Sequence, residues 1–101
     1  MVMKYDIMFL PRADRNLIDI NEYLSRFYPS TAAKFFEELD RKISLLREMP
    51  HIGQRYIHNE KYRRLLVYDY LVLYVVDESR QMIEIHRIFH GSQDIRQWME
   101  K

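Results

Sequence analysis

Basic and aromatic side chains gather in one short stretch of the sequence, Lys61-Tyr62-Arg63-Arg64. Alternation along a strand would place Tyr62 and Arg64 on one face and Arg63 on the other. A guanidinium beside an aromatic ring can hold a phosphate and stack a base, as nucleic-acid platforms do. Alternatively, the charges only protect an exposed strand from aggregation. Periodicity alone favours this structural interpretation.

A second candidate site comprises Arg87 and the residues from His90 to Asp94. Gly91 permits a sharp turn that would bring His90, Ser92 and Asp94 together. Histidine transfers protons near neutral pH and a carboxylate can orient it, so this corner could cleave or hold a phosphodiester. The structural alternative, which the sequence alone favours, has Asp94 capping a terminal helix and His90 at the rim of the core.

Other chemistries find little support in the sequence. The four histidines, His51, His58, His86 and His90, show no zinc-type spacing, and there is no cysteine. A glycine-rich phosphate loop and a nucleophile elbow are also absent. We therefore expect neither a metal nor a cofactor.

The composition indicates one globular domain over residues 1–101. Hydrophobic residues make up 48% and charged residues 31%, and the net charge is only +1. The longest apolar run, Tyr70 to Val76, is far shorter than the about 20 residues that a membrane helix needs. The first ten residues lack the apolar core of a signal peptide. We expect a cytoplasmic protein that makes no membrane contact.

Periodicity predicts a strand and two helices in the first half. Residues 4–10 alternate, as a half-buried strand does. An apolar stripe from Ala13 to Phe27 predicts a helix that begins at Pro11 and ends before Pro29. Ser30 could cap the next helix, which ends near residues 49–50. So short a link makes an antiparallel helical hairpin.

The second half predicts strands at residues 62–68, 70–76 and 82–89, followed by a short helix over residues 94–100. Trp98 on that helix either latches it onto the sheet or contacts a partner, and the latch is the simpler interpretation. The order β-α-α-β-β-β predicts an α+β two-layer fold with a helical hairpin on one face of a mostly antiparallel, four-stranded sheet. The other face should be bare, and uncovered apolar surface usually marks a partner site.

The ordered set of motifs resembles the RelE/ParE superfamily of toxins over almost the whole chain. The resemblance rests on the Pro11-Arg12-Ala13 helix start, the Pro50-x-x-Gly53 ending and three C-terminal segments: Tyr62-Arg63-Arg64-Leu65-Leu66-Val67, Tyr70-Leu71-Val72-Leu73-Tyr74-Val75-Val76-Asp77, and Ile83-Glu84-Ile85-His86-Arg87-Ile88-Phe89-His90-Gly91 with Asp94.

This resemblance implies a microbial RNase-like fold and the role of the growth-arresting toxin of a type II toxin–antitoxin system, such as those that stabilise plasmids. It further implies a cognate antitoxin, which mediates any contact with operator DNA. RelE-like members cut mRNA on the ribosome with basic residues of the open sheet face. ParE-like members resemble them in fold but poison DNA gyrase and lack that cleavage set.

Residue by residue, the resemblance is closer to ParE. Arg64 occupies a RelE-type basic position, but Tyr62 stands where another lysine is expected and Leu71 where RelE carries a catalytic arginine. The usual C-terminal tyrosine is absent, and the His90-Gly91-x-x-Asp94 ending is ParE-like.

Three functional hypotheses follow. The leading one is gyrase inhibition without chemistry of the chain's own. The alternative is a ribosome-dependent mRNA endonuclease in which Arg64, Arg87 and His90 are catalytic. The third is a degenerate member that keeps only partner binding. In each case the expected binding residues are Lys61, Tyr62, Arg63, Asp94 and Trp98.

Overall fold

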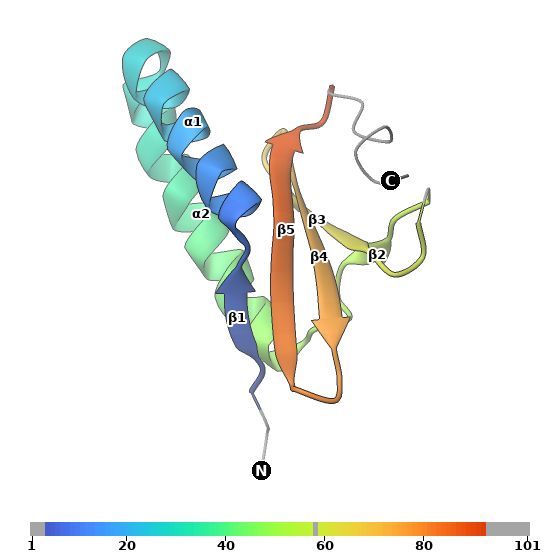
Figure 1. Cartoon of the computed structure of the whole chain (residues 1–101). Helices are drawn as coiled ribbons and strands as arrows, with labels where there is room; N and C mark the ends of the chain where they lie inside the picture. Colours follow the sequence, from blue (N-terminus) through green and yellow to red (C-terminus); the bar gives the residue numbers. More distant parts are fainter. Residues whose placement is uncertain (1–3, 58, 93–101) are drawn as a thin grey trace.

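Two long helices lie together on one face of a five-stranded sheet (Figure 1). The structure is a computed structural model that describes residues 4–57 and 59–92. The elements, in chain order, are β1 (Asp6–Phe9), α1 (Pro11–Phe27), α2 (Pro29–Glu48), β2 (Gln54–Arg55), β3 (Arg63–Val67), β4 (Tyr70–Asp77) and β5 (Met82–His90). The predicted α+β fold class is confirmed, and the expected helix over residues 94–100 lies outside the described residues.

Proline begins both helices. Pro11 and Pro29 occupy the first turns of α1 and α2, where a missing N–H costs nothing. Tyr28 between them has φ −145° and ψ 64° and so leaves the helical region, which proline disfavours for the residue before it. The prediction that Ser30 caps α2 is wrong: the helix already begins at Pro29, so Ser30 lies inside it, and Tyr28 is the cap residue.

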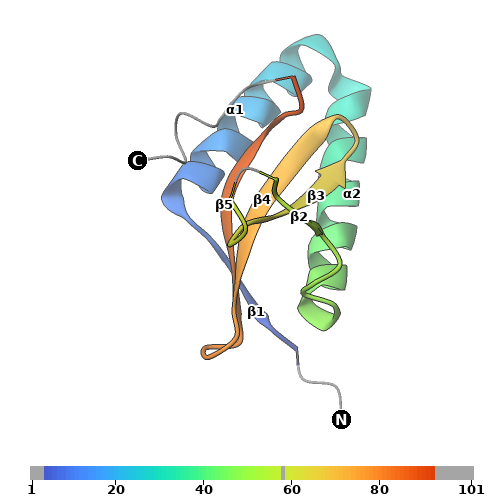
Figure 2. The same ribbon diagram turned by 90° about the vertical axis from the view of Figure 1, so that its right-hand side faces the viewer.

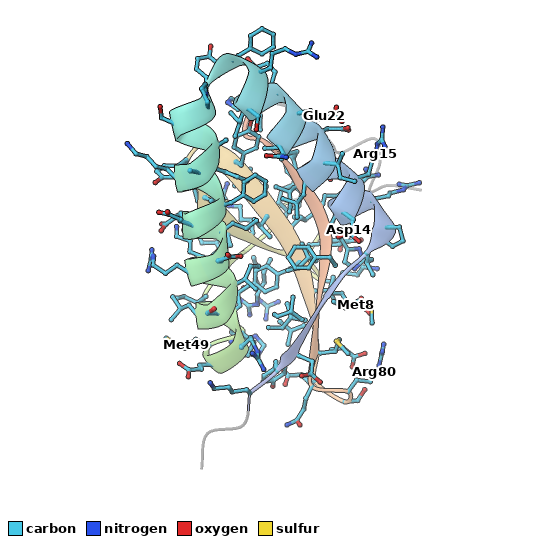
Figure 3. All side chains as sticks on the ribbon, turned by 90° about the vertical axis from the view of Figure 1, so that its left-hand side faces the viewer. Met8, Asp14, Arg15, Glu22, Met49 and Arg80 are labelled. Carbon is cyan, nitrogen blue, oxygen red and sulfur yellow. The ribbon has the colours of Figure 1, made fainter. Side chains whose placement is uncertain are left out.

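The helices pack their apolar stripes against the sheet and leave their polar stripes in solvent. Phe35 of α2 is buried against the sheet together with Ala13 and Leu24 of α1. Arg15 and Glu22 lie on the outer surface of α1 (Figure 3). The 3.6-residue period that predicted these helices therefore also identifies the faces that they bury.

The sheet has the strand order β1-β5-β4-β3-β2. β1 pairs parallel to β5, and the remaining pairs are antiparallel. β4 is the middle strand, and its Val72, Leu73 and Tyr74 are all buried, as predicted for a strand covered on both faces. β2 was not predicted, because two residues are too few to show alternation.

The face of the sheet opposite the helices, which we call the open face, is partly covered by the chain itself. The segment that follows β2 crosses this face (Figure 2), and Tyr56 and Tyr62 from it pack over Leu73 and Phe89. As a result Leu73 is only 1% exposed and Phe89 only 5%. The prediction of a bare face is wrong in this part, because the loop between β2 and β3 supplies its own apolar cover.

Candidate functional site

A β-bulge in β5 decides which side chains reach the open face. Arg87 pairs with Leu73, whereas Ile85 pairs with the next residue, Tyr74, so β5 carries one extra residue. Ile85 and Ile88 both lie in the core beneath the helices. The two residues between them, His86 and Arg87, are therefore both placed on the open face. Strict alternation would have put only one of them there.

Arg64 and Arg87 flank Leu73 across three strands. Arg64 pairs with Leu73 in β3 and β4, and Leu73 pairs with Arg87 in β5. Strands lie about 4.8 Å apart, so the two arginine backbones are about 10 Å apart on this face. Arg64 is exposed, and its Nη2 donates a hydrogen bond to Gln54 Oε1 at 2.8 Å.

The electrostatic surroundings of Arg87 differ from those of Arg64. Arg87 is half-buried, and burial lowers the pKa of its guanidinium. Arg12, at the start of α1, lowers this pKa further because it carries a like charge, while the Tyr62 hydroxyl acts in the opposite direction. A negative group placed near Arg12 and Arg87 would relieve their mutual repulsion.

Tyr62, His86 and Glu84 form a chain of polar contacts on the same face. Tyr62 Oη lies 3.4 Å from His86 Nδ1, and the two rings meet edge to face at 5.1 Å. His86 Nε2 lies 3.2 Å from Glu84 Oε1, and Arg80 lies 3.7 Å from the other oxygen of that carboxylate. One tautomer satisfies both histidine contacts, with Nε2–H donating to Glu84 and Nδ1 accepting from Tyr62. A histidine oriented by a carboxylate can transfer protons.

His90 lies on the other side of the sheet. Its ring meets the ring of Tyr70 edge to face at 5.4 Å, and Tyr70 in turn contacts Phe35 of α2 at 5.0 Å. Arg64 and Arg87 thus share the open face, but His90 faces the helices. The structure does not bring the three predicted catalytic residues together. His86, which the sequence singled out only as one of four histidines, is the histidine that accompanies the two arginines.

The predicted turn at Gly91 does bring His90 to Ser92. The ring Nδ1 of His90 lies 2.8 Å from Ser92 Oγ, which confirms this part of the prediction. The other members of the predicted corner, Asp94 and Trp98, lie outside the described residues.

The predicted binding residues Lys61 and Arg63 have separate surroundings. The ammonium of Lys61 lies 5.2 Å from the centre of the Tyr62 ring, a cation–π distance. Arg63 instead points to the turn before β2, where it donates hydrogen bonds to the carbonyl oxygens of Gly53 at 2.9 Å and His51 at 3.3 Å. Arg63 therefore holds a turn, whereas Lys61 stays beside the open face.

Two grooves border Arg64 on the open face. One, of about 390 Å³, lies between Arg64, Ile52 and Leu66, and the other, of about 290 Å³, lies between Arg64, Ile57 and Phe89. Leu71 and Arg64 line both grooves. The apolar residues at their rims are exposed, and Ile57 is 88% exposed. This region combines two exposed cations, Arg55 and Arg64, with uncovered apolar surface.

Within residues 4–57 and 59–92, no three histidine, aspartate or glutamate side chains are grouped so that they could hold a metal ion. The described helices also include none that is long and apolar enough to span a membrane.

The layered α+β fold carries basic and aromatic side chains on the sheet face away from the helices, and comparison with known proteins identifies its family. The family model described as ParE toxin of type II toxin-antitoxin system, parDE, matches residues 7–95. The chain therefore belongs to the ParE toxin family, a branch of the RelE/ParE superfamily.

Solved structures share this fold. The chromosomal ParDE toxin–antitoxin system from P. aeruginosa includes a chain that is 16% identical, with a TM-score of 0.72; the match covers 87% of this chain and 97% of that one. The toxin–antitoxin complex RelBE2 from Mycobacterium tuberculosis includes one that is 19% identical, with a TM-score of 0.60, covering 86% and 98%. A search of curated proteins finds no match.

Proposed function

We propose that this chain arrests growth in the cytoplasm by binding and inhibiting DNA gyrase, as expected of ParE-like toxins. The observation that supports this most is the family match over residues 7–95 together with Leu71. The resemblance implies a catalytic arginine at the position of Leu71 in RelE-like nucleases. Here that position is an apolar side chain between the two grooves beside Arg64. Such a surface suits protein binding better than phosphodiester cleavage.

The proposal includes a cognate antitoxin that neutralises the chain. The two solved structures described above both come from toxin–antitoxin systems. On this chain, Ile52, Ile57 and Leu66 leave apolar surface exposed around the open-face grooves. An antitoxin tail that folds as it binds would cover these side chains. Contact with operator DNA would then run through the antitoxin.

A specific observation favours a second candidate, a ribosome-dependent mRNA endonuclease. The Tyr62, His86 and Glu84 contacts place an oriented imidazole on the same face as Arg64 and Arg87. An imidazole can act as general acid or base, and guanidinium groups can hold the phosphate. In this candidate His86, rather than His90, would transfer the proton.

Expression of the chain without its antitoxin separates the two candidates. Gyrase inhibition should produce double-strand DNA breaks, whereas the endonuclease should produce mRNA ends at codon boundaries. We expect DNA breaks without codon-boundary ends. The opposite pattern would contradict the gyrase proposal in favour of the endonuclease, and no growth defect at all would indicate a degenerate member.

The variants His86→Ala and Glu84→Gln test the same choice at the residue level. If the chain is an endonuclease, removing its general acid or base should lower the cleavage rate by about 100-fold or more, and toxicity with it. If the chain acts by binding gyrase, no proton transfer is needed, so we expect both variants to keep full toxicity. The matched control is Arg15→Ala, which removes an exposed charge on the outer surface of α1. A loss of toxicity in His86→Ala with unchanged folding, but not in Arg15→Ala, would favour the endonuclease.

A further inference from the structure

A cavity of about 320 Å³ opens at one end of the molecule, on the helix side of the sheet. There the turn between α1 and α2 lies near the turn between β3 and β4 and the end of β5 (Figure 1). Six rings and one carboxylate dominate the lining of this cavity, which we call the aromatic cage: Tyr23, Tyr28, Phe35, Tyr68, Tyr70, His90 and Asp69. The sheet separates the cage from Arg64 and Arg87, so it is distinct from the open-face site.

The rings of the aromatic cage stand at large angles to one another and do not form a flat stack. Tyr23 and Tyr28 lie 6.0 Å apart between ring centres, with their planes at 50°. Tyr70 and His90 lie 5.4 Å apart with their planes at 85°. Phe35, packed against Tyr70, closes the floor. This arrangement surrounds a space with ring faces and edges, which an enclosed ligand could contact from several sides.

The backbone conformation of Tyr68 indicates that its ring has a role in binding. Its φ of 54° lies in the left-handed region, which glycine or asparagine normally occupies in a hairpin turn. The ring is 53% exposed, so burial in the core does not account for a tyrosine there. The neighbouring turn is fixed, since Gly91 N–H donates to the Asp69 carbonyl at 2.8 Å. Strained residues of this kind cluster at ligand sites.

The charge distribution of the cage favours a cation. In the part of the chain that the structure describes, no lysine or arginine lines the cavity, and Asp69 contributes a carboxylate. Burial raises the pKa of the Tyr70 hydroxyl, and Tyr23 and Asp69 raise it further because they disfavour another negative charge. Aromatic ring faces attract cations, and the attraction grows when water is excluded.

We propose that the aromatic cage binds the side chain of an arginine presented by a partner protein. Phe27 extends the apolar surface beyond the cavity, with its ring 5.2 Å from that of Tyr23 and 58% of its surface exposed. A polypeptide that inserts a cation would cover this rim, whereas a free small cation would leave it in water. The guanidinium would lie against the ring faces, with Asp69 as its counter-charge. This proposal goes beyond the proposed function, because it holds whichever target the toxin inhibits.

The test is a titration of the full chain in which the NMR signals of the Tyr68 and His90 rings report binding. The probes are N-acetyl-arginine amide and its neutral isostere, N-acetyl-citrulline amide. We expect saturable shifts with the arginine compound and at least tenfold weaker binding of the citrulline compound. Equal binding of the two, or binding of neither, would overturn the proposal.

Variants locate the binding. Tyr68→Gly relieves the backbone strain while it removes the ring, so the chain should stay folded and lose at least tenfold in affinity. Asp69→Asn should weaken binding severalfold, and Ile57→Ala on the opposite side of the sheet is the control that should bind normally. Unchanged affinity in Tyr68→Gly would overturn the proposal.

The chain's own Arg96 must be tested as a competing occupant, because the sequence places it a few residues after His90. If the arginine compound binds to the Arg96→Gln variant but not to the natural chain, the cage binds the chain's own arginine and the assignment to a partner fails. Equal binding to both chains supports the assignment.

Discussion

At the scale of single residues, Tyr74 connects the core with the turn that leads to the open-face site. Its ring is fully buried, and its hydroxyl accepts a hydrogen bond from Gly53 N–H and donates one to the Pro50 carbonyl, both at 2.9 Å. A side chain at position 53 would collide with this hydroxyl and with the Arg64 carbonyl. The Pro50-x-x-Gly53 ending is thus explained by the close approach of a buried tyrosine.

Tyr74→Phe should therefore destabilise the protein. The substitution leaves a buried N–H and a carbonyl without their partner, which costs about 1–3 kcal/mol of the free energy of unfolding. Urea unfolding measures this loss. Tyr28→Phe, which removes a hydroxyl from a half-exposed ring, is the control and should change stability by less than about 0.5 kcal/mol. Equal stability of the two variants would contradict the role given to the Tyr74 hydroxyl.

Glu78 makes stability depend on acid pH. Tyr5 Oη donates to its carboxylate at 2.5 Å and His51 Nε2 lies 2.6 Å from its other oxygen, so the pKa of Glu78 falls below its ordinary value of 4.5. A lowered carboxyl pKa stabilises the fold above about pH 4.5, and this stabilisation is lost as the pH falls through the folded-state pKa.

We expect the free energy of unfolding to decrease below pH 4.5, and to decrease less steeply in Glu78→Gln. Denaturant unfolding at several pH values between 3 and 7 measures the two slopes. Glu37→Gln, on the exposed face of α2, is the control. If Glu78→Gln has the slope of the natural chain, the contacts of Glu78 do not persist in solution.

Part of the site could be predicted from residue patterns. Alternation gave the correct face for Arg64 and Tyr62, because β3 is regular and its Leu65 and Val67 are buried beneath the helices. Alternation could not place His86 and Arg87 together, since a bulge depends on the register between β4 and β5. The spacing of Ile83, Ile85 and Ile88 is the one signal in the sequence that hints at this irregularity. The roles of Arg64, Arg87 and His90 are still predictions.

At the scale of elements, Phe35 joins α2 of the helical hairpin to the sheet. Phe35 is 1% exposed and packs edge to face against both Phe36 and Tyr70. Because Tyr70 also contacts His90, this contact supports the end of β5 as well as the core. The same side chain forms the floor of the aromatic cage.

Phe35→Ala should lower the free energy of unfolding by about 3–5 kcal/mol, since it removes a buried ring and leaves a cavity. Phe27→Ala removes the same side chain from a 58% exposed position on α1 and should cost less than about 1 kcal/mol. Thermal or denaturant unfolding of the two variants measures the difference. Similar losses in both would contradict the packing described for α2.

The elements themselves were largely predictable. The helices have a clear 3.6-residue period and are bounded by proline, and the long strands alternate or are apolar throughout. β2 escaped prediction because only its pairing with Arg63 and Arg64 makes it a strand. For the same reason the loop over Leu73 was unexpected, since its Tyr56 packs there through tertiary contacts that periodicity does not encode.

At the scale of the whole molecule, the sheet divides the chain into two functional sides. The helix side carries the core and ends in the aromatic cage. The open side carries Arg64, Arg87 and His86 around an apolar patch that the loop between β2 and β3 covers only in part. The proposed target and the proposed antitoxin tail would both use the open side, whereas the aromatic cage would be a separate binding surface on the helix side.

The most direct test of this account is a DNA supercoiling assay with purified gyrase and the purified chain. We expect the chain to inhibit supercoiling in proportion to its concentration, and His86→Ala to inhibit as strongly as the natural sequence. Full supercoiling at a large excess of folded chain would contradict the proposed function.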